Sequence, residues 1–175
     1  MYFTSDLHFF HKNILKWSNR PYETIEEMNN DIINTINKRV GPVGLLYILG
    51  DVSFGTLEDT VECLQKITTP NKILIVGNHD EHFLKRKDFI NCFKEVHHRL
   101  QLNVNKRIII LDHYPIQSWK NMHHGSIHLH GHSHGGTDNS KLNRIDVGFD
   151  PYPNILHIND IFDIIKTKEP QEETP

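Results

Sequence analysis

The sequence contains only two cysteines, Cys63 and Cys92, among its 175 residues. Two isolated cysteines cannot form the disulfide framework of a small secreted protein, or a cysteine-rich zinc site, which needs closely spaced pairs. We therefore expect reduced thiols and a cytoplasmic protein. The first dozen residues include Asp6, His8 and His11. They do not form a basic segment followed by an apolar one, so we expect no cleaved leader.

Long apolar runs and an excess of positive charge are also missing. No apolar stretch approaches the ~20 residues of a membrane-spanning helix. The 19 lysines and arginines are set against 22 acidic residues, which gives a formal net charge of −3. Proteins that hold extended nucleic acid through its phosphates usually carry a basic excess. We therefore expect neither a membrane nor an extended nucleic acid as a partner.

Histidine, by contrast, is abundant, with 14 residues. Imidazole is the commonest protein ligand of transition metals and titrates near neutral pH, so this excess favours metal chemistry. The length fits one domain, which we assign to residues 1–167. Residues 168–175 are polar and contain two prolines, and we expect them to form a disordered C-terminal tail.

Apolar patterning predicts an α/β fold. Short apolar runs at residues 1–5, 45–49 and 72–76 have the length of buried strands, and predicted helices at 13–17, 24–40 and 56–67 separate them. Thr24 and Thr56 fit N-caps, and Thr24 fits a capping box with Glu27. Further strands are expected at 93–98, 100–104, 107–111, 127–130, 144–148 and 155–158, before a last helix at 160–166. A βαβαβ half followed by a β-rich half predicts two β-sheets packed face to face and flanked by helices.

Polar clusters follow five of the predicted strands. They are Asp6-Leu7-His8, Gly50-Asp51, Gly77-Asn78-His79-Asp80, Asp112-His113-Tyr114-Pro115 and Gly131-His132-Ser133-His134-Gly135. Because ligands of α/β sheets bind beyond the carboxyl ends of the strands, we expect the five clusters to meet at one edge. Imidazole and carboxylate donors without a thiolate are typical of sites for Mn, Fe, Ni or Zn. Each cluster alone also fits an ordinary polar turn, and it is their common position after strands that indicates a binuclear metal site.

The order D-x-H, G-D, G-N-H-[DE], H, G-H-x-H resembles the calcineurin-like metallophosphoesterase superfamily over about residues 1–149. The segments SDLHFFHKNI (5–14) and 113–129 are similar to small stand-alone bacterial and bacteriophage members. Phe10 departs from their pattern, which usually has glycine at this position. The resemblance implies an α/β/β/α sandwich and a hydrolase with two divalent metal ions. Mn²⁺ is the first choice, and Ni²⁺, Fe²⁺/Fe³⁺ and Zn²⁺ are alternatives.

The same resemblance implies a role for each position of the motifs. One metal ion would be bound by Asp6, His8 and His134, the other by Asn78, His113 and His132, and both by a bridging Asp51. His79 would act near the leaving group as a general acid or charge stabiliser, and Asp80 would orient its imidazole. A metal-bridging hydroxide would attack phosphorus in line, without a covalent enzyme intermediate.

Four further residues are candidates for substrate contacts, and each has a structural alternative. His11 would line the substrate pocket or simply lie in the loop, and Asn13 would contact substrate or cap a helix. Arg20 would meet a substrate phosphate or serve the fold. Trp119 would stack on a base or sugar, or pack in the core or a lid.

The leading hypothesis is therefore a metal-dependent phosphodiesterase for a small phosphoester of the nucleotide or cyclic nucleotide class. A phosphomonoesterase of the same fold is the alternative. A non-catalytic protein-interaction scaffold on this fold would be expected to have lost ligands, particularly in the Gly-Asn-His motif. A histidine-rich metal-storage protein would lack the carboxylate and amide donors after the strands.

Overall fold

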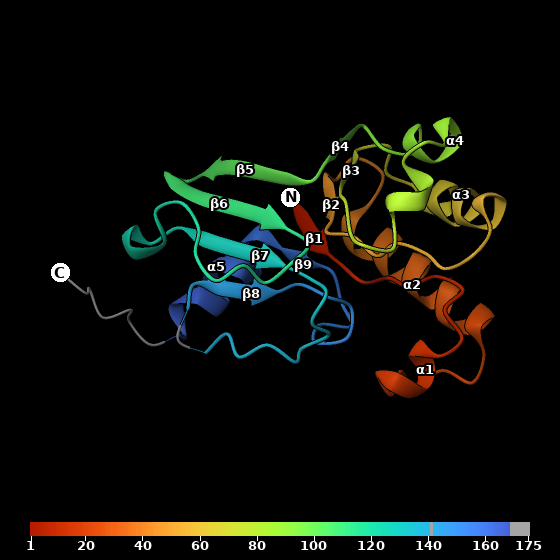
Figure 1. Cartoon of the computed structure of the whole chain (residues 1–175), viewed down its shortest axis with the longest axis horizontal. Coiled ribbons are helices and arrows are strands. Elements are labelled where there is room, and N and C mark those ends of the chain that lie inside the picture. The colour runs from red at the N-terminus through yellow and green to blue at the C-terminus, as the bar shows by residue number, and fades with distance from the viewer. Residues whose placement is uncertain (141, 169–175) are drawn as a thin grey trace.

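The structure is a computed structural model and describes residues 1–140 and 142–168 (Figure 1). Two β-sheets pack against each other, one with strand order β4-β3-β2-β1-β9 and one with strand order β5-β6-β7-β8. Helices α1 to α4 gather beside the first sheet, on the side away from the second sheet (Figure 1). This arrangement confirms the predicted α/β sandwich of two sheets with helices. Of the predicted C-terminal tail, residues 169–175 lie outside the described residues.

The first sheet combines four parallel strands with one antiparallel edge strand. The parallel strands are β1 (Tyr2–Thr4), β2 (Leu46–Ile48), β3 (Lys72–Ile75) and β4 (Glu95–His97), and β9 (Leu156–His157) pairs antiparallel with β1. Tyr2 lies opposite Leu46, and Ile73 opposite Glu95. Both faces of the sheet are covered, which explains why the central strands are continuous apolar runs.

The second sheet starts with a hairpin and continues in parallel. Its strands are β5 (Arg99–Val104), β6 (Arg107–Asp112), β7 (Ile127–His130) and β8 (Arg144–Asp146). The turn between β5 and β6 consists of Asn105 and Lys106, whose φ angles of 50° and 65° suit a two-residue hairpin turn. Strands β6, β7 and β8 are parallel, so their carboxyl ends lie at one edge.

The helices are α1 (Ile14–Trp17), α2 (Ile25–Val40), α3 (Leu57–Lys66), α4 (Lys87–Ile90) and α5 (Ile158–Lys166), with 3₁₀ turns η1 (Glu81–Phe83) and η2 (Met122–His124). Thr24 and Thr56 cap α2 and α3 as predicted. In a capping box the Glu27 carboxylate would accept from the backbone N–H of Thr24. Here it accepts from the N–H of the preceding residue, Glu23. The elements α4, η1 and η2 are too short to leave a periodic pattern and were not predicted.

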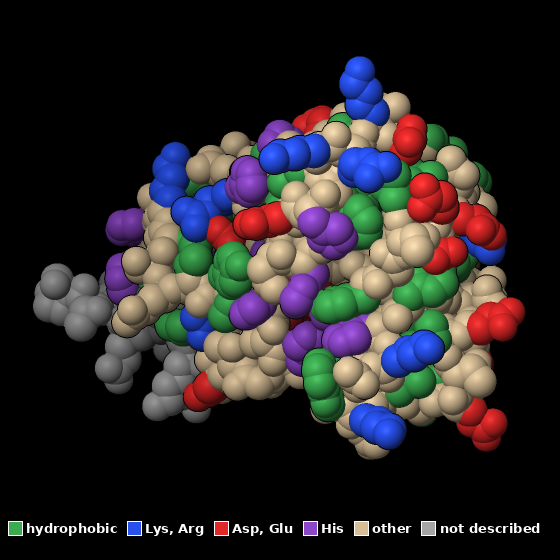
Figure 2. Space-filling model, turned by 45° about the vertical axis from the view of Figure 1, so that its right-hand side comes forward, with side chains coloured by type: hydrophobic (Ala, Val, Ile, Leu, Met, Phe, Trp, Pro, Cys, Tyr) green, Lys and Arg blue, Asp and Glu red, His purple; other side chains and the backbone are tan. Residues whose placement is uncertain are grey.

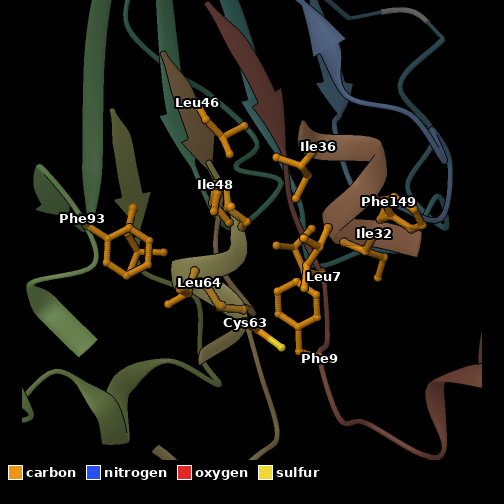
Figure 3. Packing of buried hydrophobic residues seen from close by; sticks show 14 of the residues in the cluster. Leu7, Phe9, Ile32, Ile36, Leu46, Ile48, Cys63, Leu64, Phe93 and Phe149 are labelled. Carbon is orange, nitrogen blue, oxygen red and sulfur yellow. The ribbon is translucent and has the colours of Figure 1, made fainter. Parts of the chain in front are cut away.

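The buried side chains form two clusters, one on each face of the first sheet. Leu46 and Ile48 of β2 pack with the residues of α2 and α3, as Figure 3 shows, whereas Tyr47 and Leu49 face the second sheet. Successive side chains of the strand point to opposite faces of the sheet, so one strand contributes to both buried clusters. At about 25 cal/mol per Å², complete burial of one such side chain contributes about 2 kcal/mol.

The predicted division into an N-terminal βαβαβ half and a C-terminal β-rich half is only partly right. Strands β4 and β9 come from the second half but pair with β3 and β1 of the first sheet. Lys168, assigned to the tail, donates from Nζ to the carbonyl oxygens of Asn139, Leu142 and Arg144. Within the described residues, every helix falls short of the length and apolarity needed to cross a membrane.

Candidate metal centre

The five polar clusters meet beyond the carboxyl ends of β1, β2, β3, β6 and β7, as predicted. Their side chains form two groups that could each hold a metal ion: Asp6, His8 and His134, and Asp51, His113 and His132. Within each group, one donor atom from every residue lies within 4.8 Å of the others. Figure 2 shows histidine side chains gathered at the middle of one face of the molecule.

The Asp51 carboxylate reaches toward both groups. Its Oδ1 is 3.5 Å from His113 Nε2, and its Oδ2 is 3.8 Å from His8 Nε2. Asn78 adds an amide oxygen 3.1 Å from the same His113 Nε2. These positions suit a carboxylate shared by two cations and a neutral oxygen donor beside one of them.

Two histidines are oriented by hydrogen bonds at the ring nitrogen that faces away from Asp6 and Asp51. His113 donates from Nδ1 to the Leu49 carbonyl oxygen at 2.7 Å. His134 contacts Asp150 through Nδ1, and its Nε2 is 3.9 Å from Asp6 Oδ1. Metal-binding histidines characteristically use their second nitrogen in this way, because the hydrogen bond fixes the ring and leaves the other lone pair free.

His8 gives the strongest sign that the centre is built for a cation. Its Nε2 is buried, lies 3.7 Å from Asp6 Oδ1, and has no hydrogen-bond partner among the described residues. A buried polar atom without a partner costs about 1–3 kcal/mol. Its Nδ1 lies 3.2 Å from His11 Nδ1, so His11 positions the His8 ring. Burial also lowers the pKa of His8, which favours the neutral imidazole that a metal requires.

Backbone strain is concentrated in the same loops. Five of the seven predicted ligands have a left-handed φ angle: Asp6 (54°), His8 (52°), Asp51 (53°), His132 (65°) and His134 (47°). This conformation is unfavourable for residues other than glycine and clusters at functional sites in proteins. Packing of the two sheets thus holds the ligands in positions that isolated loops would not adopt.

The departure at Phe10 has a local compensation. Phe10 has φ 63°, a value that glycine adopts more easily, which agrees with the glycine usual at this position of the pattern that the sequence resembles. A Cβ at Gly55 would overlap the Phe10 ring. Gly55 therefore makes room for the Phe10 side chain.

The glycines of two motifs are required by close approach. A Cβ at Gly77 would overlap the Asp51 carboxylate, and a Cβ at Gly131 would overlap Asp6 and Ser5. Because glycine has no side chain, the loops can pass close to the carboxylates at these two positions.

The resemblance implied that Asp80 orients the His79 imidazole, but the structure gives its carboxylate other partners. Its buried carboxylate accepts from the backbone N–H groups of Asp51 (3.0 Å), Val52 (2.9 Å) and Gly77 (2.9 Å). Burial raises the pKa of Asp80 to about 6, although these N–H groups oppose the shift. Asp80 therefore connects the loop after β2 to the loop after β3.

His79 itself is exposed, and its Nε2 is 3.9 Å from Asp51 Oδ2.

Of the two interpretations of Arg20, contact with a substrate phosphate or a role in the fold, the structure supports the second. The guanidinium is buried, and it donates to the carbonyl oxygens of Asp6 (2.7 Å) and Leu7 (2.8 Å) and to Asp150 Oδ1 (2.8 Å). Burial alone would raise the pKa of Asp150, but hydrogen bonds from His134 and Arg20 lower it to about 2. Arg20 thus holds the Asp6 loop and the carboxylate that orients His134.

Of the three remaining candidates for substrate contacts, His11, Asn13 and Trp119, only His11 contacts a predicted metal ligand in the described part of the chain. His11 contacts His8, as described above. Asn13 is exposed at the N-cap position of α1 and makes no side-chain capping bond. Trp119 is half-buried with its ring 5.3 Å from that of His128, so it packs against the second sheet.

Sequence reasoning missed three residues at the centre. Asp150 orients His134, and Asp146 accepts from Ser133 Oγ and the Gly135 N–H, both at 2.8 Å. The Phe54 ring contacts the rings of His8, His11 and His79. Only the position of Phe54, three residues after Asp51, could have drawn attention to it.

Comparisons with known proteins place the chain in a family without assigning an activity. No family model matches the chain. It is 33% identical over 136 residues to the uncharacterized protein MJ1445 of Methanocaldococcus jannaschii, a match that covers 77% of this chain and 69% of that protein. The chain belongs to the family of MJ1445. Gene 66 protein of Mycobacterium phage L5 is 25% identical over 94% of this chain and 93% of its own length.

Two solved structures are also similar. Protein AQ665 of Aquifex aeolicus, of unknown function, has a TM-score of 0.71 at 22% identity and covers 94% of this chain and 98% of its own. It shows the same fold. YfcE, a phosphoesterase from E. coli, has a TM-score of 0.48 at 19% identity over 84% of this chain and 76% of its own, which is too weak to assign an activity.

Proposed function

We propose that this protein is a binuclear metal-dependent phosphoesterase of the calcineurin-like superfamily that hydrolyses a phosphodiester of the nucleotide or cyclic nucleotide class. The observation that carries the proposal is His8 Nε2, buried without a hydrogen-bond partner among the described residues and facing Asp6 and Asp51. The donor set, carboxylate, imidazole and amide, suits divalent transition metals.

In this proposal the two groups hold two divalent cations. Asp6, His8 and His134 would hold the first, Asn78, His113 and His132 would hold the second, and Asp51 would serve both. Bound cations of this kind supply a water of lowered pKa and offset negative charge on the phosphoryl oxygens. We propose Mn²⁺ as the native metal, with Ni²⁺, iron and Zn²⁺ as alternatives.

A diester is favoured by the charges around the ligands. Among the described residues, the Asp6 and Asp51 carboxylates form ion pairs with histidines alone. The buried guanidinium of Arg20 has its donors taken up by protein oxygens. A phosphomonoester carries a second negative charge, which an additional fixed cation such as a free guanidinium would recognise. Arg20 cannot supply this cation, because its donors are already taken up.

The test is metal removal and return. Protein stripped with a chelator should be inactive on bis(p-nitrophenyl) phosphate, and Mn²⁺ or Ni²⁺ should restore hydrolysis. Release of p-nitrophenol is the measurement, with p-nitrophenyl phosphate assayed in parallel. Faster hydrolysis of the monoester would favour the phosphomonoesterase alternative. Failure of every divalent metal to restore activity on either ester would refute the enzyme assignment.

His79→Ala should keep both metal ions but lower kcat by at least ~10²-fold, the usual contribution of a positioned acid or base. The expectation follows from the exposed imidazole, which stands beside Asp51 and is free to reach a leaving group. His82→Ala, at another exposed histidine, is the matched control. Steady-state kinetics and metal content are measured together, and an unchanged kcat would remove His79 from the reaction.

A further inference from the structure

A row of aromatic rings leads from the surface to the metal centre. The Trp17 ring meets His11 edge-on with centroids 5.3 Å apart, and His11 stacks on Phe54 at 3.9 Å. Phe54 in turn lies 4.4 Å from the ring of His79. The row therefore ends beside the residue that we place next to the leaving group.

The fold does not explain the exposure of these rings. Trp17 is 72% exposed and Phe54 39% exposed, and they are two of the few large hydrophobic side chains that the described residues leave in water. The short helix α1 is anchored by Ile14, its buried residue, so Trp17 is not needed to hold it. Figure 2 shows hydrophobic side chains beside the histidines at the middle of this face. Exposed apolar groups that cluster in this way mark binding sites.

We propose that Trp17 and Phe54 form the stacking surface for the base of a nucleotide substrate, an inference that rests on the proposed function. Stacking on aromatic side chains accepts any base, because every base has a π-face. Trp119, the residue that the sequence suggested for this role, packs instead on His128. We therefore expect recognition of the base as a planar group, with little discrimination among bases.

The first test compares two diesters that share one leaving group, thymidine 5′-(p-nitrophenyl) phosphate and methyl p-nitrophenyl phosphate. The Mn²⁺-loaded protein should show a kcat/KM about 10-fold or more higher for the thymidine ester, as expected for one stacked base. Trp17→Ala and Phe54→Leu should bring the ratio of the two values toward one, mainly through KM. Val43→Ala, at a residue that is 86% exposed, is the control and should leave the ratio unchanged. A wild-type ratio near one, or a ratio that neither variant changes, would overturn the proposal.

The second test does not require hydrolysis. In Trp119→Phe protein loaded with Mn²⁺, Trp17 is the remaining tryptophan, and thymidine 5′-monophosphate should quench its fluorescence saturably. Methyl phosphate should not quench it, and Phe54→Leu should raise the Kd about 10-fold. Absence of quenching would overturn base stacking. Quenching without hydrolysis of any ester would instead refute the proposed activity and leave the base site standing.

Discussion

Asp51→Asn is expected to cost the protein at least one of two metal ions and about three orders of magnitude in kcat/KM. Both oxygens of Asp51 face histidines, with Oδ1 3.5 Å from His113 and Oδ2 3.8 Å from His8. An amide at this position carries no charge and turns N–H donors toward one of these nitrogens. Metal ions contribute several kcal/mol of charge stabilisation in the transition state, and each 1.4 kcal/mol changes the rate tenfold.

Metal content and thermal denaturation measure this effect independently of the substrate. A cation present at 100 times its Kd stabilises the folded state by about 2.7 kcal/mol, so the wild-type protein should show a clear rise in Tm with Mn²⁺. Asp51→Asn should show little of this rise. Asp163→Asn makes the same chemical change at a side chain that is 71% exposed, and should behave as the wild type. A variant that still binds two ions and keeps the full rise would show that Asp51 does not bridge them.

Much of the fold, and the meeting of the five clusters, could be predicted because both depend on patterns within short stretches of the sequence. Buried parallel strands are continuous apolar runs, and threonine caps mark where α2 and α3 begin. A cluster that follows such a strand must lie at the carboxyl edge of the sheet, whatever its loop conformation. The pairing of β4 and β9 with the first sheet depends on long-range contacts instead, and no local pattern indicates it.

The contacts behind the ligands were less predictable, because adjacency in sequence is a poor guide to where a side chain points. Asp80 follows His79 directly, yet the turn closed by the Asp80 N–H and the Gly77 carbonyl directs its carboxylate back into the protein. Arg20 and Asp150 are 130 residues apart, and neither belongs to a metal-binding motif. Such pairs become visible only when the two sheets are assembled.

Asp80→Ala should lower the free energy of unfolding by about 3–5 kcal/mol, which makes it the largest stability effect that we expect in the centre. The substitution leaves the N–H groups of Asp51, Val52 and Gly77 without their acceptor. Each such loss costs about 1–3 kcal/mol, and partial relaxation of the loops keeps the total below the sum. Urea denaturation of the metal-free protein at pH 7 measures the change. Asp88→Ala, at an exposed acidic residue, should change it by less than about 0.5 kcal/mol.

Asp80→Asn separates this positioning role from general stability. It retains one acceptor oxygen, so we expect a folded protein in which the loops after β2 and β3 are held less firmly. Loss of a group that supports metal ligands typically weakens metal binding by 10–100-fold, and competition with a chelator should show a loss of about this size for Mn²⁺. If Asp80 instead acted on His79, metal affinity would stay at the wild-type value and only kcat would fall. The two outcomes distinguish a carboxylate that builds the binding loops from one that takes part in the reaction.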